Sequence, residues 1–477
     1  MKIIGRKAER EALEGIYNAE GSKFVAVYGR RRVGKTFLVK EHFAGRLAFW
    51  HTGLSPYERS KEFLLRDQLQ AFYYSLQDFG LQDAPCPRSW LEAFRLLEQL
   101  LQSRNDGSRQ VVFIDEMPWM DTARSRFIPA FEHFWNGWAA RRDNVMLIVC
   151  GSATSWIQNN LINNKGGLYN RVTHEIKLRP FTLAECDEFF ESRGIMMSHY
   201  DIAQTYMVFG GVPHYLELFE KGLSVAQNID RLLFAPNGQL RNEFNRLFTS
   251  LFINAEQHIA VVQQLANNRC GYTRSEILQA TGIKDGGGAS LVLKALVESD
   301  FISAYKPFGE KRIERYRLID PFCLFFLRFA SRLAAPDPAF WEKNHNSPQL
   351  NAWRGYAFEE LCFSHMVQIK RALGVLAVSS QQSSWVVESV DKGRMQIDLL
   401  IDRSDNVVNL CEIKFYSGPF AISRQYDDVL RQRVQALIEQ LPRRKTVHLT
   451  LIAAYGIKPN GYNGQVQSTV TLDDLFQ

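Results

Sequence analysis

The strongest constraint on the fold of this chain is a glycine-rich segment that joins a strand to a helix. Residues Phe24–Tyr28 read FVAVY and predict a buried strand. The next eight residues, Gly29–Thr36, read GRRRVGKT, and helical sequence follows over Phe37–Phe43. Glycines in such a turn let backbone N–H groups wrap an anion, and the new helix presents its N-terminus to it. The segment therefore predicts a phosphate-binding loop of the G-x-x-x-x-G-K-[ST] kind.

The residue types of this loop indicate a nucleoside triphosphate, ATP, bound together with Mg²⁺. We expect the ammonium group of Lys35 to reach the β- and γ-phosphates, and the hydroxyl oxygen of Thr36 to bind the metal ion. The other predicted nucleotide contacts in this segment are Gly29, Arg30, Arg31, Arg32, Val33, Gly34 and Phe37.

A second apolar strand ends in two acids. Val111–Ile114 is followed directly by Asp115 and Glu116. Because the carboxyl ends of parallel strands meet at one edge of a sheet, both carboxylates are expected beside the phosphates. Asp115 would hold Mg²⁺, directly or through water, and Glu116 would polarise the attacking water. ATP hydrolysis is therefore the predicted reaction of this part of the chain.

A third apolar run, Met146–Cys150, ends at Gly151-Ser152. We expect Ser152 to sense the γ-phosphate, the alternative being an ordinary turn after a strand. Arg171 lies beyond this strand and is a candidate arginine finger, acting in cis or in trans, or else a plain surface arginine. Strands that alternate with helices predict an α/β fold built on a doubly wound parallel sheet.

Together these motifs resemble the archaeal-type P-loop ATPases of the AAA+/STAND group. The resemblance includes Ile4-Gly5-Arg6, and also Phe209-Gly-Gly-Val-Pro213, which is similar to the Gly–Pro element after the helical lid of these proteins. It extends over about the first 330 residues. The resemblance implies that Gly5, Arg6 and Pro213 lie near the adenine.

Four structural parts are expected along the chain: a P-loop ATPase core (1–180), a helical lid (181–253), a winged helix (254–335) and a C-terminal α/β domain (345–477). The winged helix is inferred from three helical segments followed by two strands. Its third helix, 290–299, holds Lys294 as its only base, so DNA contact and a purely structural role both stay open.

The C-terminal part combines strands and helices with a group of charged residues. Strands are expected at 384–390, 395–401, 407–415 and 446–453, and helices at 355–372 and 424–440. Asp398 precedes Glu412-Ile-Lys414 by a hairpin's length, which resembles the D…(D/E)xK core of PD-(D/E)xK, restriction-endonuclease-like nucleases. Glu359, on the upstream helix, fits the additional carboxylate of many members.

The chemistry of phosphodiester cleavage supports the same residues. It calls for hard cations held by carboxylates, and Glu359, Asp398 and Glu412 are the predicted metal ligands. Glu412 and Lys414 are two apart on a strand and share a face, so the ammonium group of Lys414 can stabilise the transition state. A bare Glu-x-Lys is weak by itself: Glu175-Ile-Lys177 is the same tripeptide without that context. A scaffold that has lost its activity is the alternative.

Composition limits the class of protein only loosely. A formal net charge of +6 permits nucleic acid as a partner without requiring it. The seven cysteines include no CxxC pair, which disfavours a zinc site or a disulfide framework. The N-terminus turns charged within a few residues, and no uncharged apolar run approaches the ~18 residues that span a bilayer. We therefore expect a cytoplasmic protein without a membrane partner.

The combined prediction is an ATPase coupled to a Mg²⁺-dependent DNA endonuclease-like domain, with a role in defence or mobile-element biology as an analogy. Two alternatives stay open. One is a signal-transducing ATP switch whose nuclease-like domain only binds nucleic acid or protein, and the other is a DNA motor or loader. A homo-oligomer and a protein partner are both compatible with the sequence.

Overall fold

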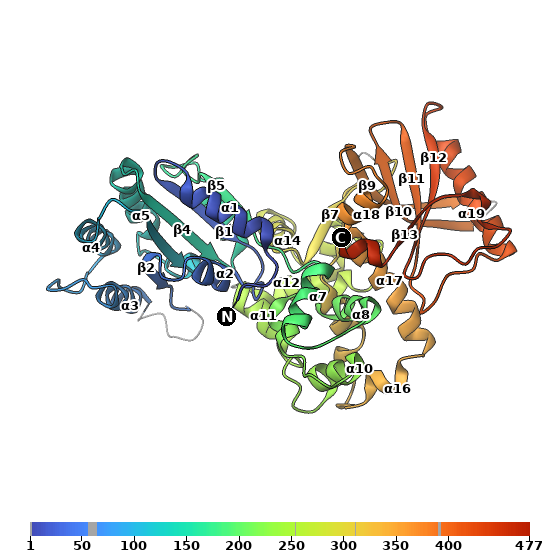
Figure 1. The fold of residues 1–477 in the computed structure, drawn as a ribbon, viewed down its shortest axis with the longest axis horizontal. Coiled ribbons are helices and arrows are strands. Elements are labelled where there is room, and N and C mark those ends of the chain that lie inside the picture. Colours follow the sequence, from blue (N-terminus) through green and yellow to red (C-terminus); the bar gives the residue numbers. More distant parts are fainter. Residues whose placement is uncertain (1, 56–63, 253, 311, 390–392) are drawn as a thin grey trace. The chain divides into compact units, whose positions relative to one another are not determined.

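A computed structural model describes residues 2–55, 64–252, 254–310, 312–389 and 393–477 (Figure 1). The chain divides into two compact units. The first consists of Met1–Pro180 with Arg246–Ala255 and Leu291–Ser299, and the second of Phe181–Asn245, Glu256–Ser290 and Asp300–Gln477. No described helix has the length and apolar character that crossing a membrane requires.

The first unit is built on a five-stranded parallel sheet in the order β2-β3-β4-β1-β5. The three predicted strands are confirmed as β1 (Lys23–Tyr28), β3 (Gln110–Asp115) and β4 (Val145–Gly151). Two further strands, β2 (Leu47–Thr52) and β5 (His174–Lys177), were not predicted. Both lie at the sheet edges. β5 reads HEIK, with His174 and Glu175 exposed and no apolar run, whereas β2 begins with the four apolar residues Leu47–Trp50, which were a usable signal.

Helices cover both faces of this sheet, as its double winding requires. Side chains of β1 alternate between two cores: Val25 and Val27 pack with α1 (Lys7–Asn18) and α2 (Lys35–His42). Phe24 and Ala26 belong to the opposite core, which is formed with α3 (Leu64–Asp78), α4 (Trp90–Ser103) and α5 (Phe127–Gly137). The α/β fold with a doubly wound sheet is therefore confirmed.

The second unit begins with helices. They are α7 (Leu183–Ser192), α8 (His199–Phe209), α9 (Pro213–Glu217), α10 (Val225–Ile229), α13 (Arg274–Thr281), α15 (Pro321–Arg328) and α16 (Phe340–Asn344), with most of α12 (Ala255–Leu265). Two further helices, α11 (Glu243–Leu251) and α14 (Gly287–Glu298), contribute residues to both units. A small antiparallel sheet in the order β6-β8-β7 joins β6 (Tyr272–Thr273), β8 (Arg315–Leu318) and β7 (Ile302–Tyr305).

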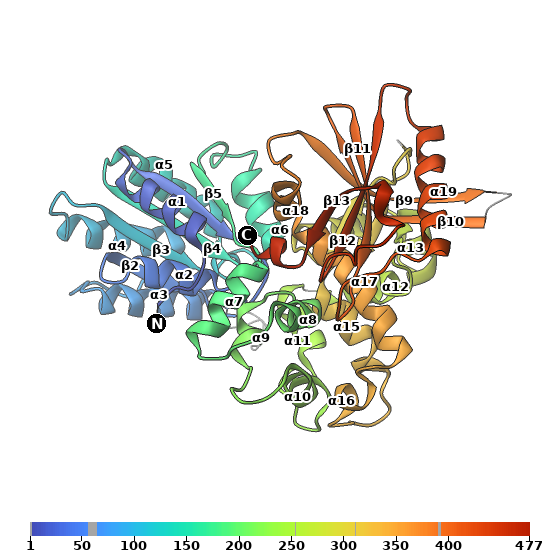
Figure 2. The ribbon, with the colours of Figure 1, turned by 45° about the vertical axis from the view of Figure 1, so that its right-hand side comes forward.

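The C-terminal part of the second unit is a five-stranded mixed sheet in the order β13-β12-β11-β10-β9. Its antiparallel meander consists of β9 (Ser380–Ser389), β10 (Gly393–Arg403) and β11 (Val407–Lys414), and β12 (Thr446–Ala453) and β13 (Val466–Thr471) run parallel to β11. Helix α19 (Arg424–Gln440) connects β11 to β12 and lies along the sheet in Figure 2, burying Leu430 and Leu437. Residue 390, the predicted end of the first strand, lies outside the described residues.

The predicted continuous helix over 355–372 is wrong. The structure has α17 (Pro348–Ser364) and α18 (Met366–Ala372), separated at His365, whose φ of −113° and ψ of 33° are not helical. The buried imidazole of His365 accepts a hydrogen bond at its Nε2 from the backbone N–H of Leu183, 3.1 Å away. The helix break is thus accompanied by a hydrogen bond to a residue 182 positions away in sequence. The helical pattern of 355–372 alone does not predict this break.

Candidate nucleotide site and candidate nuclease site

The phosphate-binding loop leaves β1 at Gly29 and enters α2 at Lys35. Gly29 has a φ of +145°, and a Cβ there would lie 2.2 Å from the carbonyl oxygen of Leu178, just after β5. Only glycine fits this approach, because the obstructing atom belongs to the backbone. The conformation of the loop therefore depends both on glycine at position 29 and on the close packing of the ends of β1 and β5.

The ammonium group of Lys35 is folded back over its own loop. Its Nζ donates to the carbonyl oxygens of Gly29 and Arg30, each at 2.9 Å, and to Ser152 Oγ at 3.1 Å. These three contacts use all of its donors, and the side chain is buried. Lys35 is thus held at the carboxyl edge of the sheet and linked to the residue that follows β4.

The carboxylate of Asp115 has the features of a cation ligand. Its Oδ2 accepts hydrogen bonds from Thr36 Oγ1 at 3.0 Å and Thr52 Oγ1 at 3.3 Å. Its Oδ1 is buried and accepts no N–H or O–H hydrogen bond from the residues that the structure describes, although the Cys150 thiol lies near this carboxylate. Burial, and then the charge of Glu116, raise the pKa of Asp115. A buried oxygen without a donor, beside a threonine hydroxyl, fits a divalent cation.

Glu116 is oriented by Ser152. The backbone of Glu116 adopts a left-handed conformation with φ of 44°, which turns the chain sharply after β3. Its Oε1 accepts from Ser152 Oγ at 2.6 Å and its Oε2 from the Ser152 backbone N–H at 3.0 Å. The structure therefore brings Lys35, Asp115, Glu116 and Ser152 together, as the sequence predicted.

The N-terminal Gly5-Arg6 element lies against the same loop. Gly5 and Arg6 both have positive φ, 60° and 56°, just before α1. Arg6 is buried, and its Nη2 donates to the carbonyl oxygen of Val33 at 3.1 Å. Among the other predicted nucleotide contacts, Arg30 and Val33 are buried and Phe37 is exposed, while Arg31, Arg32 and Gly34 are half-buried.

Arg171 is not brought to the phosphate edge of its own domain. It is exposed and precedes β5, whose residue His174 pairs with Val25 near the start of β1. The loop follows the other end of β1, roughly 13 Å further at about 3.3 Å per strand residue. The role of Arg171 in trans stays a prediction. Pro213 begins α9 in the second unit, so its predicted place near the adenine also stays a prediction.

Two contributors to the nucleotide site escaped the sequence analysis. Thr52, at the end of β2, donates to Asp115, and the Leu178 carbonyl packs on Gly29. Thr52 and Leu178 lie at the ends of two edge strands that were not predicted. Predicting those strands would have placed both residues beside the loop. Arg179, the exposed residue directly after Leu178, lies beside the loop for the same reason.

Comparison with known proteins agrees with this geometry. Residues 4–219 match the family model described as an ATPase domain predominantly from Archaea. An uncharacterized protein of Methanocaldococcus jannaschii is 22% identical over 375 residues, which cover 77% of this chain and 78% of that protein. An uncharacterized ATP-binding protein of the same organism is 46% identical over 39 residues, which cover 8% of this chain and 66% of that protein.

Solved structures include two similar chains. A Walker-type ATPase of Pyrococcus abyssi has a TM-score of 0.48 at 18% identity, covering 69% of this chain and 96% of its own. The ORC2 protein of Aeropyrum pernix has a TM-score of 0.41 at 15% identity, covering 68% of this chain and 93% of its own.

The matched family model and the loop geometry define the class: residues 4–219 form an archaeal-type, nucleotide-binding P-loop ATPase domain. The similarity to the Methanocaldococcus jannaschii protein extends beyond this domain, since it covers 77% of the chain.

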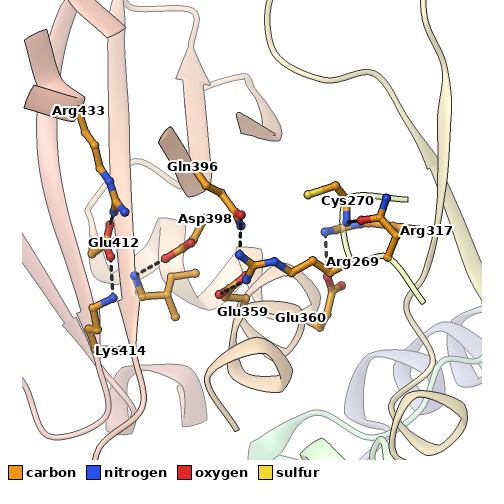
Figure 3. Close-up of polar contacts among 12 residues, drawn as sticks. Arg269, Cys270, Arg317, Glu359, Glu360, Gln396, Asp398, Glu412, Lys414 and Arg433 are labelled. Carbon is orange, nitrogen blue, oxygen red and sulfur yellow. Dashed lines mark hydrogen bonds and ion pairs between the residues drawn. The ribbon is translucent and has the colours of Figure 1, made fainter. Parts of the chain in front are cut away.

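The predicted nuclease residues are distributed over three elements of the second unit (Figure 3). Asp398 lies on β10, inside a register shift against β9 between Ile397 and Leu400. The bulge lets Ile397 and Leu400, three positions apart, enter the same core beneath α19. Asp398 Oδ2 accepts the Ile413 backbone N–H at 3.3 Å, and Asp398 lines a cavity of about 260 Å³ together with Glu359 of α17.

Charge links these carboxylates. Burial raises the pKa of Glu359, and the charge of Asp398 raises it further. Burial and then the charge of Glu412 raise the pKa of Asp398, whereas the Lys414 ammonium group lowers it. Asp398 therefore interacts electrostatically with Glu359 on one side and with Glu412 and Lys414 on the other.

The carboxylate of Glu412 is bound by two cationic side chains in this structure. It is 1% exposed, and Lys414 Nζ donates to its Oε1 at 2.6 Å, as expected for two residues on one strand face. Tyr426 and Arg433 of α19 bond to Oε1 and Oε2, respectively. Burial opposes the ionisation of Glu412, but the charges of Lys414 and Arg433 outweigh it and lower the pKa. Glu412 in turn raises the pKa of Lys414 against the effect of burial.

Within the described part of the chain, no three His, Cys, Asp or Glu side chains are arranged to hold a metal ion together. The predicted ligands Glu359, Asp398 and Glu412 are thus neighbours without forming a ready metal site. Tyr426 and Arg433 were not predicted as site residues, although their spacing of seven places them on one face of α19 and was a usable signal. Arg269 and Gln396 were not predicted either, because no local pattern reveals them.

Proposed function

We propose that the first unit hydrolyses ATP with Mg²⁺, and that its nucleotide state controls a metal-dependent DNA nuclease in the second unit. The matched ATPase model supports the first half. The second half is carried by one observation: Asp398 and Glu359, far apart in sequence, line one cavity. DNA as partner, a cytoplasmic location and a role in defence or mobile-element biology belong to the same proposal.

In the ATPase step, Lys35 exchanges its bonds to Gly29 and Arg30 for bonds to the phosphates. Thr36 and Asp115 would hold Mg²⁺, for which the buried Oδ1 of Asp115 is the free ligand. When bound, Mg²⁺ neutralises the charge that develops on the phosphates. Glu116, held by Ser152, orients and polarises the attacking water.

In the nuclease step, Asp398 and Glu359 would hold the metal ion, which neutralises charge on the scissile phosphate when bound. Glu412 can join them only by giving up a bond to Lys414, Tyr426 or Arg433. Lys414 would then face the phosphate with its ammonium group. The αβββαβ order of α17–α18, β9–β11, α19 and β12 supports a restriction-endonuclease-like scaffold for this step.

Cleavage of plasmid and linear DNA by the full chain tests the proposal, with Mg²⁺ or Mn²⁺ and with or without ATP. Asp398→Asn should abolish cutting and leave ATP turnover intact. Lys35→Ala should abolish ATP binding and any nucleotide dependence of cutting, whereas Lys165→Ala, an exposed lysine of the first unit, should behave as wild type. Cutting that persists in Asp398→Asn would exclude this residue as the metal ligand. ATP turnover that persists in Lys35→Ala would exclude the loop assignment.

A second candidate is an ATP switch whose C-terminal domain binds DNA or protein without cutting. The saturation of Glu412 by Lys414, Tyr426 and Arg433 favours it, because a carboxylate so engaged is not available to a metal ion. Fluorescence anisotropy with labelled DNA distinguishes the two candidates. Binding without cleavage under every metal and nucleotide condition would support the switch.

A further inference from the structure

Two arginines from the predicted winged-helix region bind two adjacent acids of α17 (Figure 3). Arg269, in the turn between α12 and β6, approaches Glu359 Oε1 with its Nη1 at 3.5 Å. Arg317, on β8, donates to Glu360 Oε1 at 2.9 Å. The first pair contains the predicted metal ligand Glu359, and the second contains Glu360, the next residue in the sequence.

The position of Arg269 is fixed from several sides. Its Nη2 donates to Gln396 Oε1 at 2.5 Å, and its guanidinium carbon lies 4.2 Å from the centre of the Tyr356 ring. The turn that carries it is closed by Asn268, whose side chain accepts from the Cys270 backbone N–H at 3.0 Å and donates to the Gly271 carbonyl at 3.1 Å. The guanidinium thus contacts a carboxylate, an amide and a ring at once, although its side chain is 40% exposed.

The cavity that Glu359 and Asp398 line is bordered by positively and negatively charged side chains. Arg269, Arg317, Tyr356, Glu359, Gln396 and Asp398 are among its lining residues. The charge of Arg269 lowers the pKa of Glu359, opposing burial and Asp398, which raise it. Within the cavity the guanidinium therefore provides positive charge beside the two carboxylates that the proposed nuclease would use for its cation.

We propose that Arg269 is an internal restraint that occupies the cation position beside Glu359 and Asp398 and keeps the nuclease site closed until the turn carrying it withdraws. This inference rests on the proposed nuclease function. An arginine cannot leave by losing its proton, so release requires the side chain to move away, which withdrawal of the turn between α12 and β6 would achieve. The Arg317–Glu360 pair, with side chains 12% and 18% exposed, holds the neighbouring β8 on the same helix.

Mn²⁺ binding to the full chain, measured by electron paramagnetic resonance of free Mn²⁺ without nucleotide, tests the restraint directly. Arg269→Ala, and the nearly isosteric Arg269→Gln as a second variant against misfolding, should bind Mn²⁺ at least about tenfold more tightly than wild type, since a competing charge is removed. Asp398→Asn in the Arg269→Ala background should cancel this gain, which assigns the gained ion to the cavity. Arg443→Ala, an exposed arginine before β12, should behave as wild type.

DNA cleavage by the same samples separates this inference from the proposed function. Tighter Mn²⁺ binding without cutting would support the restraint and refute the nuclease. Equal Mn²⁺ binding by wild type and both Arg269 variants would overturn the restraint, and cutting by all of them would still uphold the nuclease. A gain that survives Asp398→Asn would also overturn the restraint, because the ion would then bind elsewhere.

Discussion

Ser152 holds Glu116 with both of its donors, the hydroxyl at 2.6 Å from Oε1 and the backbone N–H at 3.0 Å from Oε2. The same hydroxyl accepts from Lys35 Nζ at 3.1 Å, so three residues from three strand ends form one chain of hydrogen bonds. Because Ser152 bonds to both side chains, a nucleotide that draws Lys35 onto its phosphates acts on a partner of the residue that orients Glu116. The phosphate-binding loop and the predicted general base are thus physically linked.

Replacing Ser152 should separate ATP binding from ATP turnover. Ser152→Ala keeps the backbone N–H bond to Glu116 but loses the hydroxyl bond, so the carboxylate is less well oriented toward the water. We expect kcat to fall by roughly 10- to 100-fold, below the full ~10²–10⁴-fold contribution of a general base, while the Kd for ATP changes little. Steady-state turnover and binding of a fluorescent ATP analogue measure the two quantities. An unchanged kcat would show that Ser152 does not position Glu116.

Gly29 should tolerate no side chain. In Gly29→Ala the new Cβ would meet the Leu178 carbonyl oxygen at 2.2 Å, so the loop or the end of β5 must shift. We expect loss of ATP binding and a melting temperature lower by several degrees. Gly45→Ala is the matched control, because Gly45 also has positive φ, +75°, but no atom lies within 4 Å of its added Cβ. The control should cost only about 1–2 kcal/mol of unfolding free energy and leave ATP binding intact. Similar losses in both variants would contradict the steric argument.

The Arg317–Glu360 pair should behave as a buried ion pair. Arg317→Met removes the charge that compensates a carboxylate whose pKa burial raises, and we expect a loss of roughly 2–4 kcal/mol in unfolding free energy. The double variant Arg317→Met/Glu360→Leu should recover much of this loss, because no unpaired charge is left. Urea denaturation of wild type, the single variants Arg317→Met and Glu360→Leu, and the double variant measures the difference. Additive effects of the two substitutions would show that the side chains are not coupled.

Stability should depend on pH through His365. Burial lowers the pKa of His365 to about 4, whereas an unfolded histidine titrates near its usual value of about 6.5. Between these values the unfolded chain binds more protons, so the contribution of neutral His365 is complete above pH ~6.5 and is lost as pH falls toward 4. At pH ~5 the loss is roughly 2 kcal/mol.

The variant His365→Gln isolates this contribution. Its amide oxygen can accept the Leu183 N–H without titrating, so the difference in urea midpoint between pH ~7.5 and ~5 should be smaller than in wild type. An equal pH dependence in both proteins would show that His365 does not titrate on unfolding.

Recognition of the ATPase site from sequence succeeded because its chemistry is local. The loop needs glycines, a lysine and a threonine at fixed spacing after a strand, and Asp115-Glu116 follows a continuous apolar run. Edge strand β5 carries no such run, so Leu178 was missed, whereas the run Leu47–Trp50 of β2 was not recognised as a strand, so Thr52 was missed. The break at His365 was missed because its partner, Leu183, is 182 residues away.

The sequence by itself determined the residue types that ATP chemistry requires and the parallel sheet that gathers them, since both depend on short-range patterns. Only the tertiary structure decided the state of the C-terminal carboxylates. It paired Glu412 with Arg433 and Tyr426 of α19, and brought Arg269 to Glu359 across 90 residues. The reason is physical: a buried carboxylate is defined by which charges surround it, and folding brings those charges from elements that are distant in sequence.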